Sequence, residues 1–141
     1  MMFNNFVYLP IKTKFIFEKT FIMTTKEIAS RLVSLCQKGD FHKAIEELYA
    51  KDAVSLEQQA SPAFEKETRG LEAIYEKGKK WNDMVEEVHS ITVSDPIIAD
   101  QSFACTMRMD VTIKEMGKMD MTELCVYKVK DGKIVQEEFF S

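Results

Sequence analysis

Residues 118–141, KMDMTELCVYKVKDGKIVQEEFFS, contain two alternating stretches joined by Asp131-Gly132. Such alternation predicts β-strands, and an Asp-Gly pair between two strands is typical of a tight hairpin turn. One face of the first strand carries a carboxylate in an otherwise apolar row: Met119, Met121, Glu123, Cys125 and Tyr127. The returning strand places Glu137 between Val135 and Phe139. The hairpin therefore points two glutamates in the same direction as its aromatic and sulfur side chains.

Two further strands are predicted upstream of the hairpin, in residues 85–95 and 97–113. Asp95-Pro96 and Met116-Gly117 mark the turns at their ends. Strands joined by such turns are expected to pair antiparallel with their neighbours in sequence. The apolar face of the second strand is formed by Phe103, Cys105, Met107 and Met109.

Three helices are predicted before these strands, because apolar side chains recur at helical spacing in residues 25–38, 41–49 and 71–81. Gly39 is suited to end the first helix, and Asp40 can cap the second. Helices followed by a run of antiparallel strands predict an α+β fold. We expect a cone-shaped, curved antiparallel sheet wrapped around the three helices, with a mostly apolar pocket at its wide end.

A short strand and a polar loop are predicted between the second and third helices. Residues 53–58, AVSLEQ, alternate and place Ser55 and Glu57 on one face. The segment QASPAFEKETRG, residues 59–70, should pass the open end of the cone, where Phe64 can act as a gate. A plain surface loop is the alternative.

Length, charge and cysteine content limit the classes of partner. A chain of 141 residues suits one domain, and a net charge of -4 with a pI near 5.3 gives no reason to expect nucleic acid or an anionic membrane as partner. No apolar run reaches the roughly 18 residues of a membrane span. Three unevenly spaced cysteines, Cys36, Cys105 and Cys125, favour buried thiols in a reducing, cytoplasmic compartment.

The N-terminus is expected to lie outside the fold. Thr24-x-x-Glu27 is a capping box that marks the start of regular structure. We therefore predict an extension over residues 1–22 and a domain over residues 23–141. The alternative is a genuine N-terminal strand or helix.

Four segments in order carry a resemblance to a known family: YAKDAVSLE (49–57), WNDMVEEVHSITVSDP (81–96), FACTMRMDVT (103–112) and ELCVYKVKDGKIVQEEFF (123–140). Together they resemble SnoaL-like proteins of the nuclear transport factor 2-like superfamily, which also contains ketosteroid isomerases and scytalone dehydratase. The resemblance covers residues 24–141. It implies a cone-shaped, cystatin-like α+β roll with an internal pocket, often assembled as a homodimer.

The resemblance also locates a candidate for proton transfer. In ketosteroid isomerases a carboxylate on the first short strand shuttles a proton, and the matching position here is Glu57. The positions that match the two oxyanion donors of those enzymes are Leu32 and Cys125, so both donors are missing. Because each missing donor costs roughly 3 to 4 kcal/mol of transition-state stabilisation, steroid isomerisation is not expected. Glu123 lies on the same face as Cys125 and is a possible substitute.

Four side chains are the candidate acid and base groups: Glu57, His89, Glu123 and Glu137. Burial and a nearby carboxylate both raise the pKa of a carboxyl group, which suits it to proton transfer near neutral pH. We expect Glu57 to be the mobile base, with Glu123 or a charged His89 stabilising the negative charge that develops. Alternatively, Glu123 and Glu137 only accept hydrogen bonds from Tyr49, Tyr127 or Trp81 within the core, or lie at the open rim in water, and His89 is a core residue.

The expected pocket walls are aromatic or sulfur side chains: Tyr49, Trp81, Cys105, Met107, Met109, Cys125, Tyr127 and Phe139. We expect no metal, because the histidines and cysteines are scattered, and no cofactor, because no phosphate-binding loop motif occurs.

The sequence thus predicts a protein that binds an apolar small molecule. One interpretation is an enzyme that catalyses a cofactor-independent proton transfer of the isomerase, cyclase or dehydratase type. A non-catalytic binding or association module is the other, and the sequence leaves open whether the protein is an enzyme. We also expect a homodimer through the outer sheet face, with Arg108 of one copy against Asp110 of the other. The remaining residues of that face are Ala104, Thr106, Thr112, Leu124, Val126 and Lys128.

Overall fold

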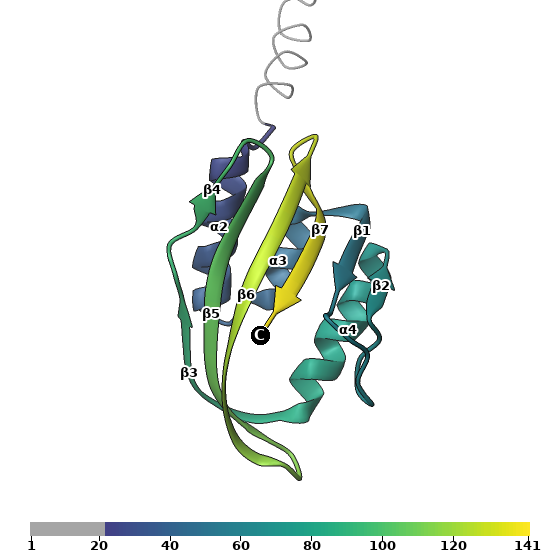
Figure 1. Ribbon diagram of the computed structural model, residues 1–141, viewed down its shortest axis with the longest axis vertical. Coiled ribbons are helices and arrows are strands. Elements are labelled where there is room, and N and C mark those ends of the chain that lie inside the picture. The colour runs from purple at the N-terminus through teal and green to yellow at the C-terminus, as the bar shows by residue number, and fades with distance from the viewer. Residues whose placement is uncertain (1–21) are drawn as a thin grey trace, which may run out of the picture.

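The computed structural model describes residues 22–141, so the predicted N-terminal extension lies outside the described residues apart from Ile22. The helices are α2 Thr25–Gln37, α3 Phe41–Leu48 and α4 Leu71–Met84. The strands are β1 Tyr49–Leu56, β2 Glu67–Arg69, β3 Val85–Val93, β4 Ile97–Ile98, β5 Ser102–Ile113, β6 Gly117–Lys130 and β7 Lys133–Phe140. The helices lie against one face of a curved sheet (Figure 1), which confirms the predicted α+β class. No helix within residues 22–141 has the length and apolar character needed to cross a membrane.

The seven strands form one open sheet in the order β2-β1-β7-β6-β5-β3, with β4 paired to β5. The strands β5, β6 and β7 form the predicted antiparallel meander, and β3 pairs antiparallel with β5. The sheet is nevertheless mixed, because β1 runs parallel to β7. These two strands lie at opposite ends of the domain sequence, so no hairpin turn sets their relative direction. The short strand β2 forms within the predicted loop and extends the sheet beyond β1.

Local turn chemistry fixes the helix ends. Thr24 accepts from the backbone N–H of Glu27 at 3.2 Å, and the Glu27 side chain accepts from the Thr24 N–H at 3.1 Å, so the predicted capping box forms. Gly39 follows α2 with a φ of 77°, which an L-residue with a side chain rarely adopts. Asp40 precedes α3, but contrary to expectation its side chain makes no capping hydrogen bond to the described residues.

Two strands depart from simple alternation. Residues 97–113 form not one strand but two, because Ala99 N–H donates to Ser102 O at 2.8 Å and folds β4 back onto β5. In β7 a register shift opposite Lys128 places Ile134 in the core, whereas Val135, predicted to share the face of Glu137, is partly exposed. A bulge of this kind turns the extra residue out of the regular alternation.

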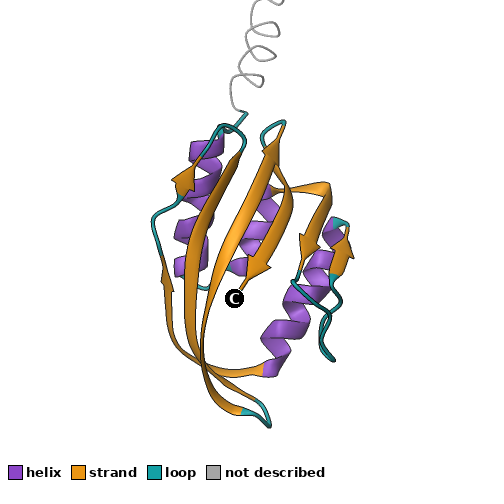
Figure 2. Cartoon of the chain, in the orientation of Figure 1, coloured by secondary structure: helices purple, strands orange, loops and turns teal. Residues whose placement is uncertain are grey.

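The core lies between the helices and the inner face of the sheet, as the arrangement in Figure 2 indicates. Helix α2 contributes Ile28, Leu32 and Leu35, all of them almost fully buried. On β5 every second side chain is buried against the helices: Phe103, Cys105, Met107, Met109, Val111 and Ile113. Burial of this apolar face, at roughly 25 cal/mol per Å² of apolar surface, is the main stabilising contribution to the fold.

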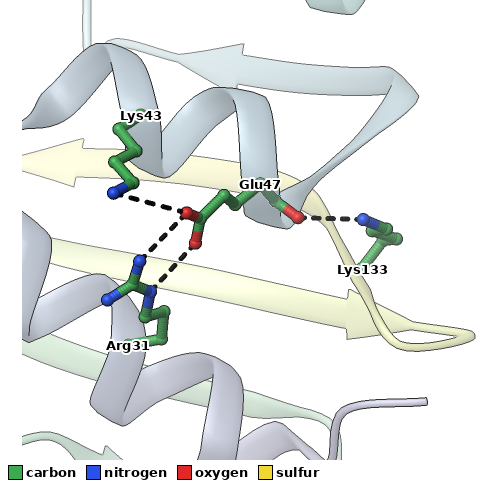
Figure 3. A network of polar contacts seen from close by, with 4 residues as sticks. All are labelled: Arg31, Lys43, Glu47 and Lys133. Carbon is green, nitrogen blue, oxygen red and sulfur yellow. Dashed lines mark hydrogen bonds and ion pairs between the residues drawn. The ribbon is translucent and has the colours of Figure 1, made fainter. Parts of the chain in front are cut away.

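A cluster of charges joins α2, α3 and the final hairpin (Figure 3). Arg31 makes two hydrogen bonds to the Glu47 carboxylate, both of 2.9 Å, and Lys43 lies 3.9 Å from the same group. Lys133, at the start of β7, donates to the Glu47 backbone carbonyl at 2.9 Å. Because Glu47 precedes Tyr49 by two residues, this cluster fixes the point at which β1 enters the sheet beside β7.

The outer sheet face carries an ion pair that was not predicted. Arg108 makes two hydrogen bonds to Asp120 of the same chain, at 2.9 and 2.6 Å. Asp110 and Asp120 are directly opposed in the β5–β6 register, so Arg108 offsets the repulsion between them. The guanidinium that was expected to meet Asp110 of a second copy is therefore already paired within the chain.

Candidate functional site

A cavity of about 630 Å³ lies between α3, α4 and the inner sheet face. Its walls include six of the predicted ligand-binding residues: Tyr49, Trp81, Met107, Met109, Tyr127 and Phe139. They also include apolar side chains that the sequence analysis had not assigned to the site: Phe41, Ile45, Ile74, Tyr75 and Met121. The predicted acid and base candidates Glu57, Glu123 and Glu137 all line the same space. The volume is in the range of small-molecule sites, roughly 300 to 1,000 Å³.

Glu137 sits at the buried end of this cavity with its carboxylate held by two hydroxyl groups. Its exposed fraction is 7%, Tyr49 Oη donates to Oε1, and Ser55 Oγ donates to Oε2 at 2.6 Å. Burial raises the pKa of Glu137, while the hydrogen bonds from Ser55 and Tyr49 oppose that shift. Because both oxygens are occupied, Glu137 is suited to fix the geometry of the wall.

Lys77 connects this buried carboxylate to the one nearer the surface. Its Nζ donates to Ser55 Oγ at 2.9 Å and forms an ion pair with Glu57 Oε1, also at 2.9 Å. The Lys77 side chain is 15% exposed and that of Glu57 25%. Glu57 follows the last residue of β1, but the ion pair holds its carboxylate in place, which differs from the mobile base that we expected.

Glu123 is the third carboxyl group on the wall, and it differs from the other two. Within residues 22–141 its side chain forms neither a hydrogen bond nor an ion pair, although it faces the cavity. Burial raises the pKa of Glu123, the charge of Glu57 raises it further, and Lys77 partly opposes both effects. A partly buried carboxyl group without partners is suited to accept or release a proton.

His89 does not belong to this site. The β3–β5 register shifts between Val88 and Ser90, so His89 is the extra residue of a bulge. Its Nε2 lies 2.7 Å from Thr112 Oγ1, on the outer side of the sheet. The expectation that His89 shares a face with Ile91 assumed unbroken alternation, and the bulge is the reason that it was wrong.

The predicted wall residues Cys105 and Cys125 are buried but do not reach the cavity. They are direct partners in the β5–β6 register, and their thiols face each other. The hydrogen bond to Cys105 and burial both raise the pKa of Cys125, so the thiol form is favoured. Cys36 does line the cavity, and burial raises its pKa to about 12.

Lys77 and Ser55 contact the acid and base candidates, although neither was predicted to belong to the site. Lys77 lies three residues after Ile74 and four before Trp81, both of which face the cavity, so helical spacing indicates its direction. Ser55 shares the strand face of Glu57 and is fully buried. This spacing was not used to predict that Lys77 faces the cavity, because a lysine is usually expected on the solvent-exposed face of a helix.

The loop between β1 and β2 passes the same cavity. Phe64 and Ser61 are among the lining residues, and Lys80 Nζ lies 5.7 Å from the Phe64 ring centroid and donates to Ala63 O. The Glu57 N–H donates to Lys66 O at 2.8 Å, which anchors the far end of the loop. The position agrees with a gate, whose movement stays a prediction.

No group of three or more histidine, cysteine, aspartate or glutamate side chains in residues 22–141 is arranged to hold a metal ion. At the inner end of the cavity the polar groups include the carboxyls of Glu57, Glu123 and Glu137 and the ammonium of Lys77, beside apolar wall residues. This arrangement can bind an apolar molecule with a polar end and can exchange a proton with it.

The family model of the SnoaL-like domain matches residues 23–141. A crystal structure of a candidate SnoaL-like polyketide cyclase from Mesorhizobium loti is 35% identical, with a TM-score of 0.78 over 84% of this chain and 100% of that chain. No curated protein matches.

Two more distant structures share the fold. A candidate isomerase from Bacillus subtilis is 21% identical, with a TM-score of 0.61 over 80% of this chain and 82% of that one. A hypothetical protein from Catenulispora acidiphila with a ketosteroid isomerase-like fold is 15% identical, with a TM-score of 0.65 over 84% and 87% of the two chains. The family match over residues 23–141 and the similarity to the Mesorhizobium loti protein show that the chain belongs to the SnoaL-like domain family.

Proposed function

We propose that this protein binds an apolar carbonyl compound in its cavity and catalyses a cofactor-independent proton transfer, of the kind used by isomerases, cyclases and dehydratases. The observation that carries the proposal is Glu123, whose carboxyl group lines the cavity and has no hydrogen-bond or ion-pair partner among the described residues 22–141. The description of the Mesorhizobium loti relative as a candidate polyketide cyclase supports the substrate class, since polyketides bear carbonyl groups.

The division of roles among the three glutamates follows from their contacts. Glu137 is held by Tyr49 and Ser55, and Glu57 by Lys77, so neither can move toward a ligand without losing a charged interaction. Glu123 has no such interaction to lose. We therefore assign proton transfer to Glu123 rather than to Glu57.

In this reaction the Glu123 carboxylate removes a proton from the carbon next to the carbonyl group and returns it at the same or another atom. A raised pKa makes the carboxylate a stronger base, although a smaller fraction is ionised at a given pH. The rate should therefore increase as the pH rises through the raised pKa of Glu123 and then reach a plateau.

The test is deuterium incorporation from heavy water into a panel of apolar β-keto esters and cyclic diketones, followed by NMR. Wild-type protein should accelerate the exchange of at least one member, and Glu123→Gln should abolish the acceleration. Glu86→Gln, an exposed glutamate on β3, is the matched control and should behave like wild type. Binding without exchange for the whole panel would refute the enzyme and favour the non-catalytic binding module.

We also propose that two copies associate through the outer sheet face. The supporting observation is a group of apolar side chains there, including Leu124, which is 43% exposed and paired with Phe140 in the β6–β7 register. Val54 and Leu56 of β1 continue the apolar strip beside β7. Since Arg108 is already paired with Asp120, apolar contact rather than an Arg108–Asp110 pair would supply the attraction.

A further inference from the structure

Lys77 is a largely buried lysine on the wall of the cavity. Its ammonium contacts one residue of strand β1 and one residue of the loop that follows it. It donates to Ser55 Oγ and to Glu57 Oε1, each at 2.9 Å. The same nitrogen lies 5.3 Å from the centroid of the Phe139 ring, on β7. With a side-chain exposure of 15%, the ammonium is largely withdrawn from water.

An ammonium group has three N–H donors and no acceptor. Two donors of Lys77 are used by Ser55 and Glu57, and no third acceptor occurs among residues 22–141. Because Lys77 lines the cavity, the remaining donor is available to a molecule bound there. The aromatic ring and the two acceptors hold the ammonium in position before any ligand arrives.

We propose that Lys77 is a catalytic residue, which donates its third N–H to the carbonyl oxygen of the substrate and stabilises the enolate that forms. This inference rests on the proposed function and specifies its substrate class: an apolar carbonyl compound with an acidic hydrogen on the adjacent carbon. The carbon–hydrogen bond breaks and the proton passes to the Glu123 carboxylate. The electron pair forms the carbon–carbon double bond of the enolate, and the carbonyl oxygen gains the negative charge that Lys77 faces.

Three other side chains offer no hydrogen-bond donor to the cavity. Leu32 is on the wall and cannot donate, and Cys125 does not reach the cavity. The Tyr49 hydroxyl is already used by Glu137. Lys77 and Glu123 line the same cavity. A carbonyl oxygen on Lys77 can thus place the neighbouring carbon toward Glu123.

The proposal is tested with 4-nitrophenol, whose phenolate resembles an enolate and absorbs differently from the neutral phenol. The probe 4-nitrotoluene has a methyl group in place of the hydroxyl and reports apolar binding alone. Removing Lys77 by itself would leave Glu57 without its partner, so the comparison is made in a Glu57→Gln background. Lys77→Met removes the donor, and Lys77→Gln, which retains a donor toward Ser55, serves if the methionine variant is unstable.

Glu57→Gln should raise the ratio of bound phenolate to bound phenol relative to wild type, because the Lys77 charge is no longer neutralised. Adding Lys77→Met or Lys77→Gln should lower that ratio by roughly tenfold or more, the expected loss of a hydrogen bond to a charged group. The affinity for 4-nitrotoluene should not change. An equal ratio with and without Lys77, or no binding of 4-nitrophenol by wild type, overturns the proposal.

The probe experiment requires no turnover, which separates the two proposals. Absence of deuterium exchange with normal 4-nitrophenol behaviour refutes proton transfer and leaves Lys77 as an oxygen-binding residue. If deuterium exchange is lost in Glu123→Gln but kept when Lys77 is replaced, the role of Lys77 is refuted and the proton-transfer proposal stands.

Discussion

Replacing Tyr49 by phenylalanine should destabilise the protein, because the buried carboxylate of Glu137 loses a hydrogen-bond donor. The variant removes the hydroxyl that donates to Glu137 and leaves only Ser55 to satisfy that carboxylate. A hydrogen bond to a charged group contributes roughly 1.5 to 3 kcal/mol, and the Glu137 residue is only 7% exposed. For a domain of this size the loss corresponds to a decrease in Tm of roughly 5 to 15 °C.

The assay is urea unfolding at neutral pH and again near pH 4.5, the ordinary pKa of a glutamate. The Tyr49 hydrogen bond holds down the raised pKa of Glu137, so its loss moves that pKa further up. The free-energy difference between wild type and variant should therefore be larger at neutral pH. Tyr127→Phe is the control, because the buried Tyr127 makes no side-chain hydrogen bond within residues 22–141. Equal stability of Tyr49→Phe and Tyr127→Phe would refute the role given to Glu137.

Three further outcomes are expected. Burial raises the folded-state pKa of Glu123, so the free energy of unfolding of the wild type should fall relative to that of Glu123→Gln as the pH rises above 4.5. A difference in unfolding free energy that stays constant with pH in urea titrations would contradict this. Light scattering should show a dimer that Leu124→Asp dissociates and Val88→Asp, on exposed β3, does not; a wild-type monomer at micromolar concentration would contradict it. Phe64→Ala should speed dissociation of a fluorescent apolar ligand in stopped-flow measurements without lowering Tm, and an unchanged rate would remove the gate.

The order of helices and strands could be predicted because each element carries its own periodicity. The capping box at Thr24 and the hairpin at Asp131-Gly132 are local signals, and the structure forms both. The parallel pairing of β1 with β7 has no local signal, since it depends on how the rest of the chain folds between them.

The site was predictable to the extent that strand alternation holds. Glu123 faces the cavity because β6 alternates regularly around it, and Glu137 shares a face with Phe139 beyond the irregularity at Val135. The bulge in β3, in contrast, moved His89 to the outer face. Arg108 could pair with either neighbouring aspartate, and only the register of β5 with β6 selects Asp120. Lys77 was predictable from its helical spacing but was hidden by the assumption that a lysine faces water.

The most direct test of the account is a carbon-13 NMR titration of the side-chain carboxyl group of Glu123, assigned by comparison with Glu123→Gln. We predict that the pKa of Glu123 in the wild type lies above the ordinary value of 4.5, because the group is partly buried and near the Glu57 charge. In Glu57→Gln the pKa of Glu123 should fall, since the repelling carboxylate is gone and Lys77 is no longer neutralised. An ordinary pKa for Glu123 in the wild type, unaffected by Glu57→Gln, would contradict the claim that this carboxyl group is tuned for proton transfer.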